Sequence, residues 1–416
     1  MDIAGALARS RRPGSENMRS PNELSVFFVL LFLSACVGQK TASAGLPLDP
    51  SVVIDLKKVG WRPALDESNR SFFKDFSTAK LEALDDTTKI LFLTKDLVVV
   101  YHTNQQGTNW RTATRQLEAF FISAKDGSLL RTKTWPTVQR RSRDELRDSE
   151  ARLIPLQDGR FLVMANGRMM LYESNLELVK ELELSPFTST DLWAVQTVAE
   201  GKQIFLRHES QTDLHVTYSW LASDTLRVLR EMPGYQAKNF DVLRNVTAGE
   251  QGVFTFSDSG IRMIAPGPSI KTICDDRLCD TDGENFQVIS SRYLAISGKK
   301  GIGIVDIGRG LAWSKTVGPE YDSPKYDPHM FQFGETVSNL SGSRLAVWVT
   351  SEPKGIFDGV KINSSPTLFV YDVLGLRRLS LVSIKSVNGQ WDVAFSPDGA
   401  KLAVYDGAKL KIYAVG

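Results

Sequence analysis

The chain repeats a unit of short strands and tight turns, and this repeat constrains the fold more than any other feature of the sequence. In the last unit, residues 391–395 alternate apolar and polar side chains, and Ser396-Pro397-Asp398-Gly399 has the composition of a turn. Two further apolar or alternating runs follow, at residues 401–405 and 410–415. Helical periodicity is nearly absent beyond residue 50. The sequence therefore predicts an all-β fold.

Comparable units precede the last one at about 335–385, 286–317, 240–274, 192–233, 151–185 and 79–135. Each unit offers an inner strand, a turn, a strongly apolar second strand, a third strand and usually a fourth. A repeat of roughly 35 to 50 residues with four strands is typical of a β-propeller. We predict a seven-bladed β-propeller of four-stranded antiparallel blades, with a six-bladed ring as the alternative if one unit is misread.

The ring is expected to close with strands from both ends of the chain. The last unit shows three strands, whereas residues 51–56 form an apolar strand that has no local partner. We predict that this N-terminal strand supplies the missing fourth strand of the last blade. Such closure removes an open sheet edge that would otherwise favour aggregation.

The pattern Phe395-Ser-Pro-Asp-Gly-x-x-Leu-Ala403 resembles the blade motif of WD-repeat and TolB-like propellers. The resemblance is strongest over residues 391–403 and is confined to the last unit. It implies a propeller that serves as a binding or scaffold module. The expected domain organisation differs from that of TolB-like proteins, because we expect no separate N-terminal α/β domain before the blades. The resemblance therefore implies no specific role in the Tol system.

Charge and hydrophobicity exclude several classes of partner. The 50 basic residues nearly balance the 48 acidic ones, so no global field favours nucleic acid or an anionic membrane. No apolar run reaches the roughly 18 to 20 residues that a membrane-spanning helix needs. We expect a monomer whose partner is a protein or a glycan, with no nucleic acid bound.

The N-terminal region is typical of an export signal. Residues 24–37 form an apolar run of signal-peptide length, Arg19 precedes it, and small residues follow. We therefore predict that residues 1–44 are a signal peptide, or a lipoprotein signal with its tether, and that residues 51–416 form the propeller domain. Whether Met1 or Met18 starts the chain stays open.

Two cleavage sites compete within this region. Leu33-Ser34-Ala35-Cys36 resembles the lipobox of bacterial lipoproteins, which implies lipidation of Cys36 and contact with a membrane only through that anchor. Ala42-Ser43-Ala44 instead fits an ordinary signal peptidase, and Cys36 would then be discarded. Either site predicts an exported protein, periplasmic or anchored in the outer membrane.

Cys274 and Cys279 are close in sequence and form an even pair in a chain expected to be exported, which favours a disulfide. A loop this short contributes only about 2 kcal/mol to stability. Metal binding by these thiols is the weaker alternative, because no second Cys or His pair completes a tetrahedron.

The two faces of the predicted propeller differ in their connections. Turns such as Asp126-Gly127, Asp158-Gly159 and Asp398-Gly399 are short and share one face. The long excursions fall on the other face, at residues 102–116, 136–150, 275–285, 319–334 and 351–366. Long loops on a rigid scaffold commonly carry function, so we expect binding on this second face.

One long excursion mixes aromatic residues, carboxylates and a histidine, a composition suited to contacting a sugar, a peptide or a protein. The candidate binding residues are Tyr321, Asp322, Tyr326, Asp327, His329 and Phe331. The alternative is a connector stiffened by proline, with tyrosines at the surface.

A second excursion is rich in carboxylates, which are ligands that calcium prefers. The candidate metal ligands are Asp275, Asp276, Asp280, Asp282 and Glu284. The spacing is not that of an EF-hand, and a solvated acidic loop is the alternative. Calcium is the only cofactor that the sequence suggests.

No nucleophile elbow, zinc motif or phosphate-binding loop occurs, so no catalytic residue is assigned. We predict a noncatalytic binding or scaffold propeller of a bacterial cell envelope. The alternative is a propeller hydrolase or lactonase with a metal at the central channel. A convergent ring of Asp, Glu, Asn or His at the channel mouth would favour the enzyme.

Overall fold

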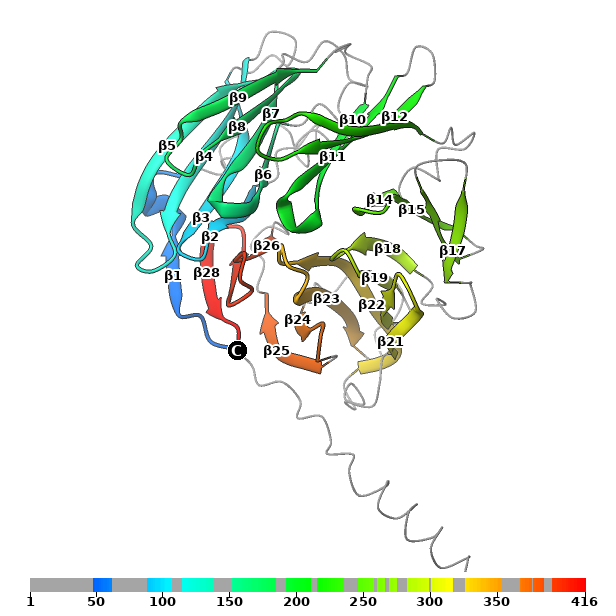
Figure 1. Ribbon diagram of the computed structural model, residues 1–416. Helices are drawn as coiled ribbons and strands as arrows, with labels where there is room; N and C mark the ends of the chain where they lie inside the picture. The colour runs from blue at the N-terminus through cyan, green and yellow to red at the C-terminus, as the bar shows by residue number, and fades with distance from the viewer. Residues whose placement is uncertain are drawn as a thin grey trace, which may run out of the picture. The chain divides into compact units, whose positions relative to one another are not determined.

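A computed structural model shows that the chain folds into seven separate four-stranded antiparallel sheets, arranged in a ring (Figure 1). The predicted propeller is confirmed, and the number of blades is seven rather than six. Among the described residues, no helix is long and apolar enough to cross a membrane. The structure describes residues 48–61, 88–106, 114–137, 151–184, 192–210, 215–234, 246–257, 260–265, 269–274, 283–298, 301–316, 326–353, 367–375, 377–384 and 391–416.

The blades follow the order of the chain, and within each blade the strands are ordered from the inside of the ring outward. Blade 1 consists of β2 (Lys89–Thr94), β3 (Leu97–Gln106), β4 (Thr114–Ser123) and β5 (Leu129–Pro136). Blade 2 consists of β6 (Arg152–Pro155), β7 (Phe161–Ala165), β8 (Arg168–Tyr172) and β9 (Leu178–Glu183). Blade 3 consists of β10 (Leu192–Val198), β11 (Gln203–Glu209), β12 (Val216–Ala222) and β13 (Val228–Pro233).

The other four blades repeat this order. Blade 4 consists of β14 (Val246–Ala248), β15 (Val253–Ser257), β16 (Gly260–Ile264) and β17 (Ile270–Cys274). Blade 5 consists of β18 (Gly283–Val288), β19 (Tyr293–Gly298), β20 (Gly301–Asp306) and β21 (Gly310–Thr316). Blade 6 consists of β22 (Tyr326–Ser338), β23 (Arg344–Pro353), β24 (Thr367–Asp372) and β25 (Arg377–Ser383). Blade 7 consists of β26 (Asp392–Phe395), β27 (Lys401–Tyr405), β28 (Lys409–Ala414) and β1 (Val52–Asp55).

Burial within a blade falls from the second strand to the outer strand, which explains the strand sequences. In blade 2, every residue of the apolar strand β7 is buried, because neighbouring blades cover both of its faces. Half of the residues of the outer strand β9 are charged, and the strand is almost entirely exposed. Short 3-10 helices occur at η1 (Leu56–Val59), η3 (Gln157–Gly159) and η4 (Ala199–Gly201).

The hydrophobic core is divided into seven clusters, and each cluster lies between two neighbouring blades. The cluster between blades 7 and 1, for example, contains Ile54, Ile90 and Leu410. Each blade therefore buries its apolar faces against two neighbours, as expected for a repeat fold in which one unit cannot bury its own core.

The predicted closure by an N-terminal strand is confirmed. Strand β1 pairs antiparallel with β28, and Ile54 lies opposite Leu410 (Figure 1). Both the backbone amide and the Oγ of Ser51 donate to the carbonyl of Ile412, over 2.7 and 2.9 Å. On the inner side, the Ile90 amide donates to Asp392 Oδ2 over 2.7 Å and so links blade 1 to blade 7. Strands from both ends of the chain therefore close the ring.

Antiparallel order places the connections on two faces. One face carries the turns between first and second strands and between third and fourth strands, and we call it the short-turn face. The long-connection face carries the links between second and third strands and between successive blades, among them residues 107–113, 138–150, 275–282, 317–325 and 354–366, all outside the described residues.

Candidate functional site

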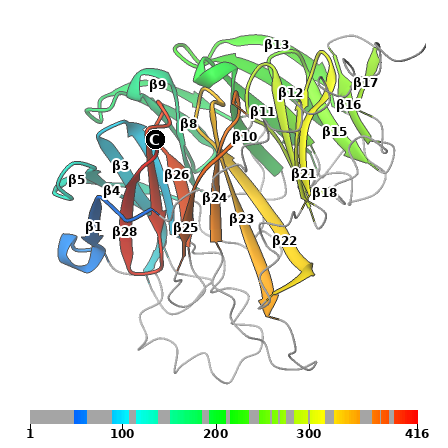
Figure 2. The same ribbon diagram turned by 90° about the horizontal axis from the view of Figure 1, so that it is seen from below.

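Two blades extend beyond the others on the long-connection face. Strand β22 has 13 residues and β23 has 10, and the ladder begins where Tyr326 lies opposite Pro353. Figure 2 shows this pair reaching past the neighbouring strands. In blade 1, β3 and β4 have 10 residues each and pair up to Gln106 and Thr114. At about 3.3 Å per residue, these hairpins project well beyond a blade of ordinary strand length.

This geometry corrects the extent of the predicted excursions. Residues 102–106, 114–116, 326–334 and 351–353 were expected in loops and lie in strands instead, and within 326–334 the ladder to β23 is formed by Tyr326 and residues 331–333. The physical reason is that the paired segments supply each other with ladder partners, which a strand pattern read from one segment does not reveal. Within the excursion 319–334, residues 319–325 lie outside the described residues.

The candidate binding residues are split by the same boundary. The backbone of Tyr326, Asp327, His329 and Phe331 lies in β22, at the end that leads from the long-connection face. Tyr321 and Asp322 lie outside the described residues. The role of these six residues in binding stays a prediction.

The acidic candidates and the cysteines are only partly described. Glu284 lies in β18, whereas Asp275, Asp276, Asp280 and Asp282 fall outside the described residues. Cys274 ends β17 and is disulfide-bonded. Because Cys279 and Cys36 both lie outside the described part, the pairing and the calcium site stay predictions. The described residues contain no group of three or more His, Cys, Asp or Glu that could hold a metal ion.

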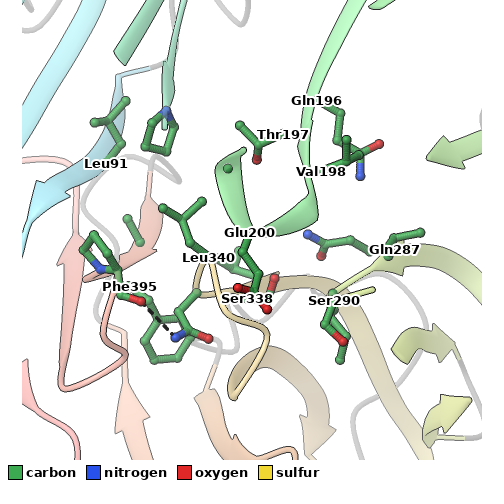
Figure 3. Close-up of a pocket in the computed structure, with 18 of the residues that line it drawn as sticks. Leu91, Gln196, Thr197, Val198, Glu200, Gln287, Ser290, Ser338, Leu340 and Phe395 are labelled. Atoms are coloured by element: carbon green, nitrogen blue, oxygen red, sulfur yellow. Dashed lines mark hydrogen bonds between the residues drawn. The ribbon is translucent and has the colours of Figure 1, made fainter. Parts of the chain in front are cut away.

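The central channel holds a pocket of about 280 Å³ at its short-turn end. Its wall is built from inner strands and from the turns that follow them, including Ala199–Gly201 of η4 and the loop residues Gly249, Ser290 and Leu340. Figure 3 shows this arrangement, with Glu200 and Leu340 between the two sides of the pocket. Residues far apart in sequence therefore share one small cavity.

The two sides of the pocket differ in polarity. Blades 7, 1 and 2 contribute mainly apolar side chains, such as Phe395, Leu91 and Leu153. Blades 3, 5 and 6 contribute polar groups, among them Gln196 and Gln287 (Figure 3). The pocket thus offers an apolar wall opposite a hydrogen-bonding wall.

Hydrogen bonds between inner strands fix the polar wall. The side chain of Gln196 donates to the carbonyl of Ala248 over 3.3 Å and accepts from its amide over 3.1 Å. Thr247 Oγ1 accepts from the Val288 amide, and Gln287 Oε1 accepts from Thr336. A side chain of one blade therefore satisfies backbone or side-chain groups of the next, which holds the wall in place.

Two glutamates stand at the rim of the pocket. Glu200 and Glu250 are both exposed and occupy the turns after the inner strands of blades 3 and 4. Ala199 and Glu200 adopt left-handed φ angles of 50° and 57°, a conformation that costs energy for residues other than glycine. At Gly201 a Cβ atom would lie 2.8 Å from the Gln157 amide nitrogen of blade 2, so only glycine fits there. Packing against blade 2 thereby holds Glu200 at the rim.

The turn between β26 and β27 explains the blade motif of the sequence. Ser396 Oγ donates to Asp398 over 2.6 Å and accepts from the Lys401 amide over 2.9 Å, while Gly399 has a left-handed φ of 72°. The motif therefore encodes the turn from the inner to the second strand in a ring of seven four-stranded blades. The protein is a seven-bladed β-propeller.

Solved structures similar to this chain include several WD40 domains, all at low sequence identity. The C-terminal WD40 domain of Sif2 is 9% identical, with 89% of this chain and 99% of that chain covered and a TM-score of 0.41. The Pan2 WD40 domain of Neurospora crassa is 7% identical, with coverages of 79% and 89% and a TM-score of 0.46. The WD40 domain of SCAP from fission yeast is 9% identical, with 80% of this chain and 95% of that chain covered and a TM-score of 0.38. No family model and no curated protein matches the chain. At these identities and TM-scores, nothing follows about what this propeller binds.

Sequence reasoning missed the pocket of this propeller. Gln196 and Gln287 are polar residues of the inner strands β10 and β18, and each lies three residues before a turn. That recurring position was the available signal. Their convergence depends on ring closure, which no single unit of the sequence displays.

Proposed function

We propose that the protein is an exported binding or scaffold propeller of a bacterial cell envelope, which engages a protein or a glycan through its long-connection face. The asymmetry between the two faces carries this proposal. Paired strands of blades 1 and 6 project on the long-connection face, whereas tight turns such as Asp158-Gly159 cover the opposite face. Variable connections on a rigid scaffold are well suited to recognition.

The experiment replaces the connections and leaves the blades intact. One variant exchanges residues 354–366 for a short Gly-Ser linker, and a second does so for residues 317–325, without entering β22. A third variant, Asp158→Asn, serves as the control on the short-turn face. Wild type and variants, each checked by thermal unfolding, are used to capture partners from envelope extract and on a glycan array.

The proposal expects a protein or glycan that binds wild type and Asp158→Asn equally and is lost from at least one linker variant. Ligands that bind all four proteins alike would contradict it. Loss with Asp158→Asn alone would contradict it too, because binding would then lie on the short-turn face.

Export and anchoring belong to the same proposal and have their own test. The apolar run 24–37 and the lipobox ending at Cys36 support them. In a bacterial host, labelled fatty acid is expected on the wild-type chain and not on Cys36→Ser. A labelled Cys36→Ser chain, or a wild type that stays in the cytoplasm, would count against it.

No specific observation favours the metal-dependent hydrolase. The described lining of the channel pocket contains Glu200, Glu250 and the buried Asn339, and the described residues include no group of three or more His, Cys, Asp or Glu that could hold a metal. Asn339 is occupied within its own turn, where its side chain bonds Ser341, Ser343 and the Arg344 amide. We therefore advance no enzymatic function.

A further inference from the structure

The pocket at the short-turn end of the channel has a lining with one sign of charge. Among its described lining residues, Glu200 and Glu250 are the only ones that carry a charge, and no Lys, Arg or His faces the cavity. A cavity lined by one sign of charge between low-dielectric walls focuses its field and concentrates ions of the opposite sign. The pocket should therefore attract a cation.

The carboxylate of Glu200 is free to meet such a ligand, and the carboxylate of Glu250 is only partly neutralised. No ion pair between described residues involves the side chain of Glu200 or Glu250. Arg230 approaches Glu250 but donates to its backbone carbonyl over 2.7 Å, and its guanidinium stacks 3.8 Å over the Trp220 ring. Arg230 therefore offsets part of the charge of Glu250 and leaves Glu200 unmatched.

The shape and polarity of the pocket restrict the ligand further. At about 280 Å³ the cavity is just below the size range of roughly 300–1,000 Å³ typical of pockets for drug-sized ligands. Its apolar wall includes Leu91, Leu153 and Phe395, which suits a chain of methylene groups. Long cationic side chains are commonly bound in this way, with the stem on apolar surface and the charged head toward water.

We propose that the short-turn end of the channel binds an aliphatic cation, an ammonium or guanidinium group carried on a short apolar stem. The stem lies against the apolar wall of blades 7, 1 and 2, and the charged group meets the rim carboxylates of Glu200 and Glu250. A lysine or arginine side chain of a partner protein and a free alkylamine share this chemistry. The inference concerns the face opposite the long connections and does not rest on the proposed function.

Binding is tested on the full chain with n-pentylamine as the probe and 1-pentanol as its uncharged analogue, at matched ionic strength. Saturation-transfer NMR measures contact, and a titration gives the dissociation constant. We expect pentylamine to bind at least tenfold more tightly than pentanol, and added salt to weaken its binding. Equal binding of the two probes, or none of either, would overturn the proposal.

Three variants test separately whether binding depends on the rim charges, on the open cavity and on this particular turn. Glu200→Gln/Glu250→Gln keeps the shape of the rim and is expected to weaken pentylamine binding at least tenfold. Leu340→Trp fills the pocket without changing its charge and is expected to abolish binding. Asp158→Asn removes an acidic group from the corresponding turn of blade 2, outside the pocket lining, and should leave binding unchanged. Pentylamine binding that survives the double variant, or that Asp158→Asn weakens equally, would contradict the site.

The source of the cation is resolved by a second probe, the capped peptide acetyl-Gly-Lys-Gly-amide. Tighter binding of this peptide than of pentylamine supports the site and assigns it to a side chain of a partner protein, whose backbone contacts the rim. Tighter binding of pentylamine supports the site and assigns it to a free amine. Thermal unfolding of each variant verifies that the blades remain folded.

Discussion

His102 is the clearest case in which a single residue makes stability depend on pH. Its side chain is only 1% exposed, Nε2 lies 3.3 Å from Glu118 Oε2, and the rings of Trp61 and Phe120 pack around it. Burial lowers the pKa of His102 by disfavouring the charged imidazolium, although the Glu118 carboxylate acts in the opposite direction. The folded protein therefore holds this histidine neutral to lower pH than the unfolded chain does.

We predict that the free energy of unfolding falls as the pH drops below about 6.5, the ordinary pKa of histidine. The unfolded chain then takes up a proton that the folded chain resists, so stability is retained above this pH and lost below it, with a slope of at most about 1.4 kcal/mol per pH unit from this group. Urea unfolding of wild type and His102→Leu between pH 7.5 and 5 measures the difference. The variant should show the flatter profile, whereas His215→Gln, at an exposed position, should follow wild type. Parallel profiles for wild type and His102→Leu would refute this explanation.

Two glycines with left-handed φ angles allow the energetic cost of the backbone conformation to be distinguished from the cost of a clash between blades. Gly342 has a φ of 67°, and a Cβ atom there would collide with the backbone carbonyl of Ile289 in the neighbouring blade. Gly60 has a φ of 86° and open space around the same position. Gly60→Ala should cost about 1 kcal/mol for the backbone conformation alone, and Gly342→Ala clearly more. Chemical denaturation measures both, and equal losses would mean that the blades do not meet tightly at Ile289.

At the scale of elements, the outer strands share an irregularity that protects the sheet edges. In blades 1, 2, 3, 5 and 6 the register between third and fourth strands shifts at the same place, next to the turn that joins them. Exposed apolar residues such as Leu130, Val179 and Leu229 lie at these bulges. Because a bulge twists an edge strand and interrupts its ladder, it hinders pairing with another chain.

The closing strand β1 should contribute to stability through one face only. Ile54 is 4% exposed and packs in the cluster between blades 7 and 1, whereas the adjacent Val53 is 51% exposed. We expect Ile54→Ala to lower the free energy of unfolding by about 2–4 kcal/mol through lost contacts and a cavity. Val53→Ala should change it by less than about 0.5 kcal/mol. Comparable effects of the two substitutions in denaturant unfolding would argue against a buried β1.

Strands and short turns could be predicted from the sequence because their signals are local. Pro397-Asp398-Gly399 and Asp158-Gly159 mark turns by chemistry that the structure reproduces. The error at residues 326–334 arose because that strand depends on a partner in β23, beyond a turn, and its proline and charged residues favour a loop when read alone. Segments whose conformation is set by a distant partner are not encoded in local patterns.

At the scale of the whole protein, the sequence repeat was sufficient to predict the ring of blades. The channel pocket, which forms only in the closed ring, could not be predicted. The units before the last are divergent, yet their spacing and the unpartnered strand at residues 51–56 were sufficient to predict seven blades and their closure. The channel pocket combines Leu91, Glu200 and Gln287 from three different blades. Such a site requires the relative positions of the blades, which depend on packing between them and not on any one unit.

Both the fold and the pocket depend on closure of the seven-bladed ring by the pairing of β1 with β28. A disulfide across the β1–β28 ladder tests this closure directly. Val53 lies opposite Lys411, so Val53→Cys/Lys411→Cys in a Cys36→Ser background places two thiols within disulfide reach. Val53→Cys/Lys409→Cys is the control, because Lys409 lies opposite Asp55 and is out of register with Val53. Mass spectrometry and denaturant unfolding are carried out before and after mild oxidation.

A closed ring predicts an intramolecular disulfide that forms readily in the Val53/Lys411 variant and much less readily in the control. Because the cross-link would join strands from opposite ends of the chain, it should raise the free energy of unfolding by about 3–5 kcal/mol over the reduced form. A variant that stays reduced, forms disulfides only between molecules, or reacts no faster than the control would contradict the closed ring.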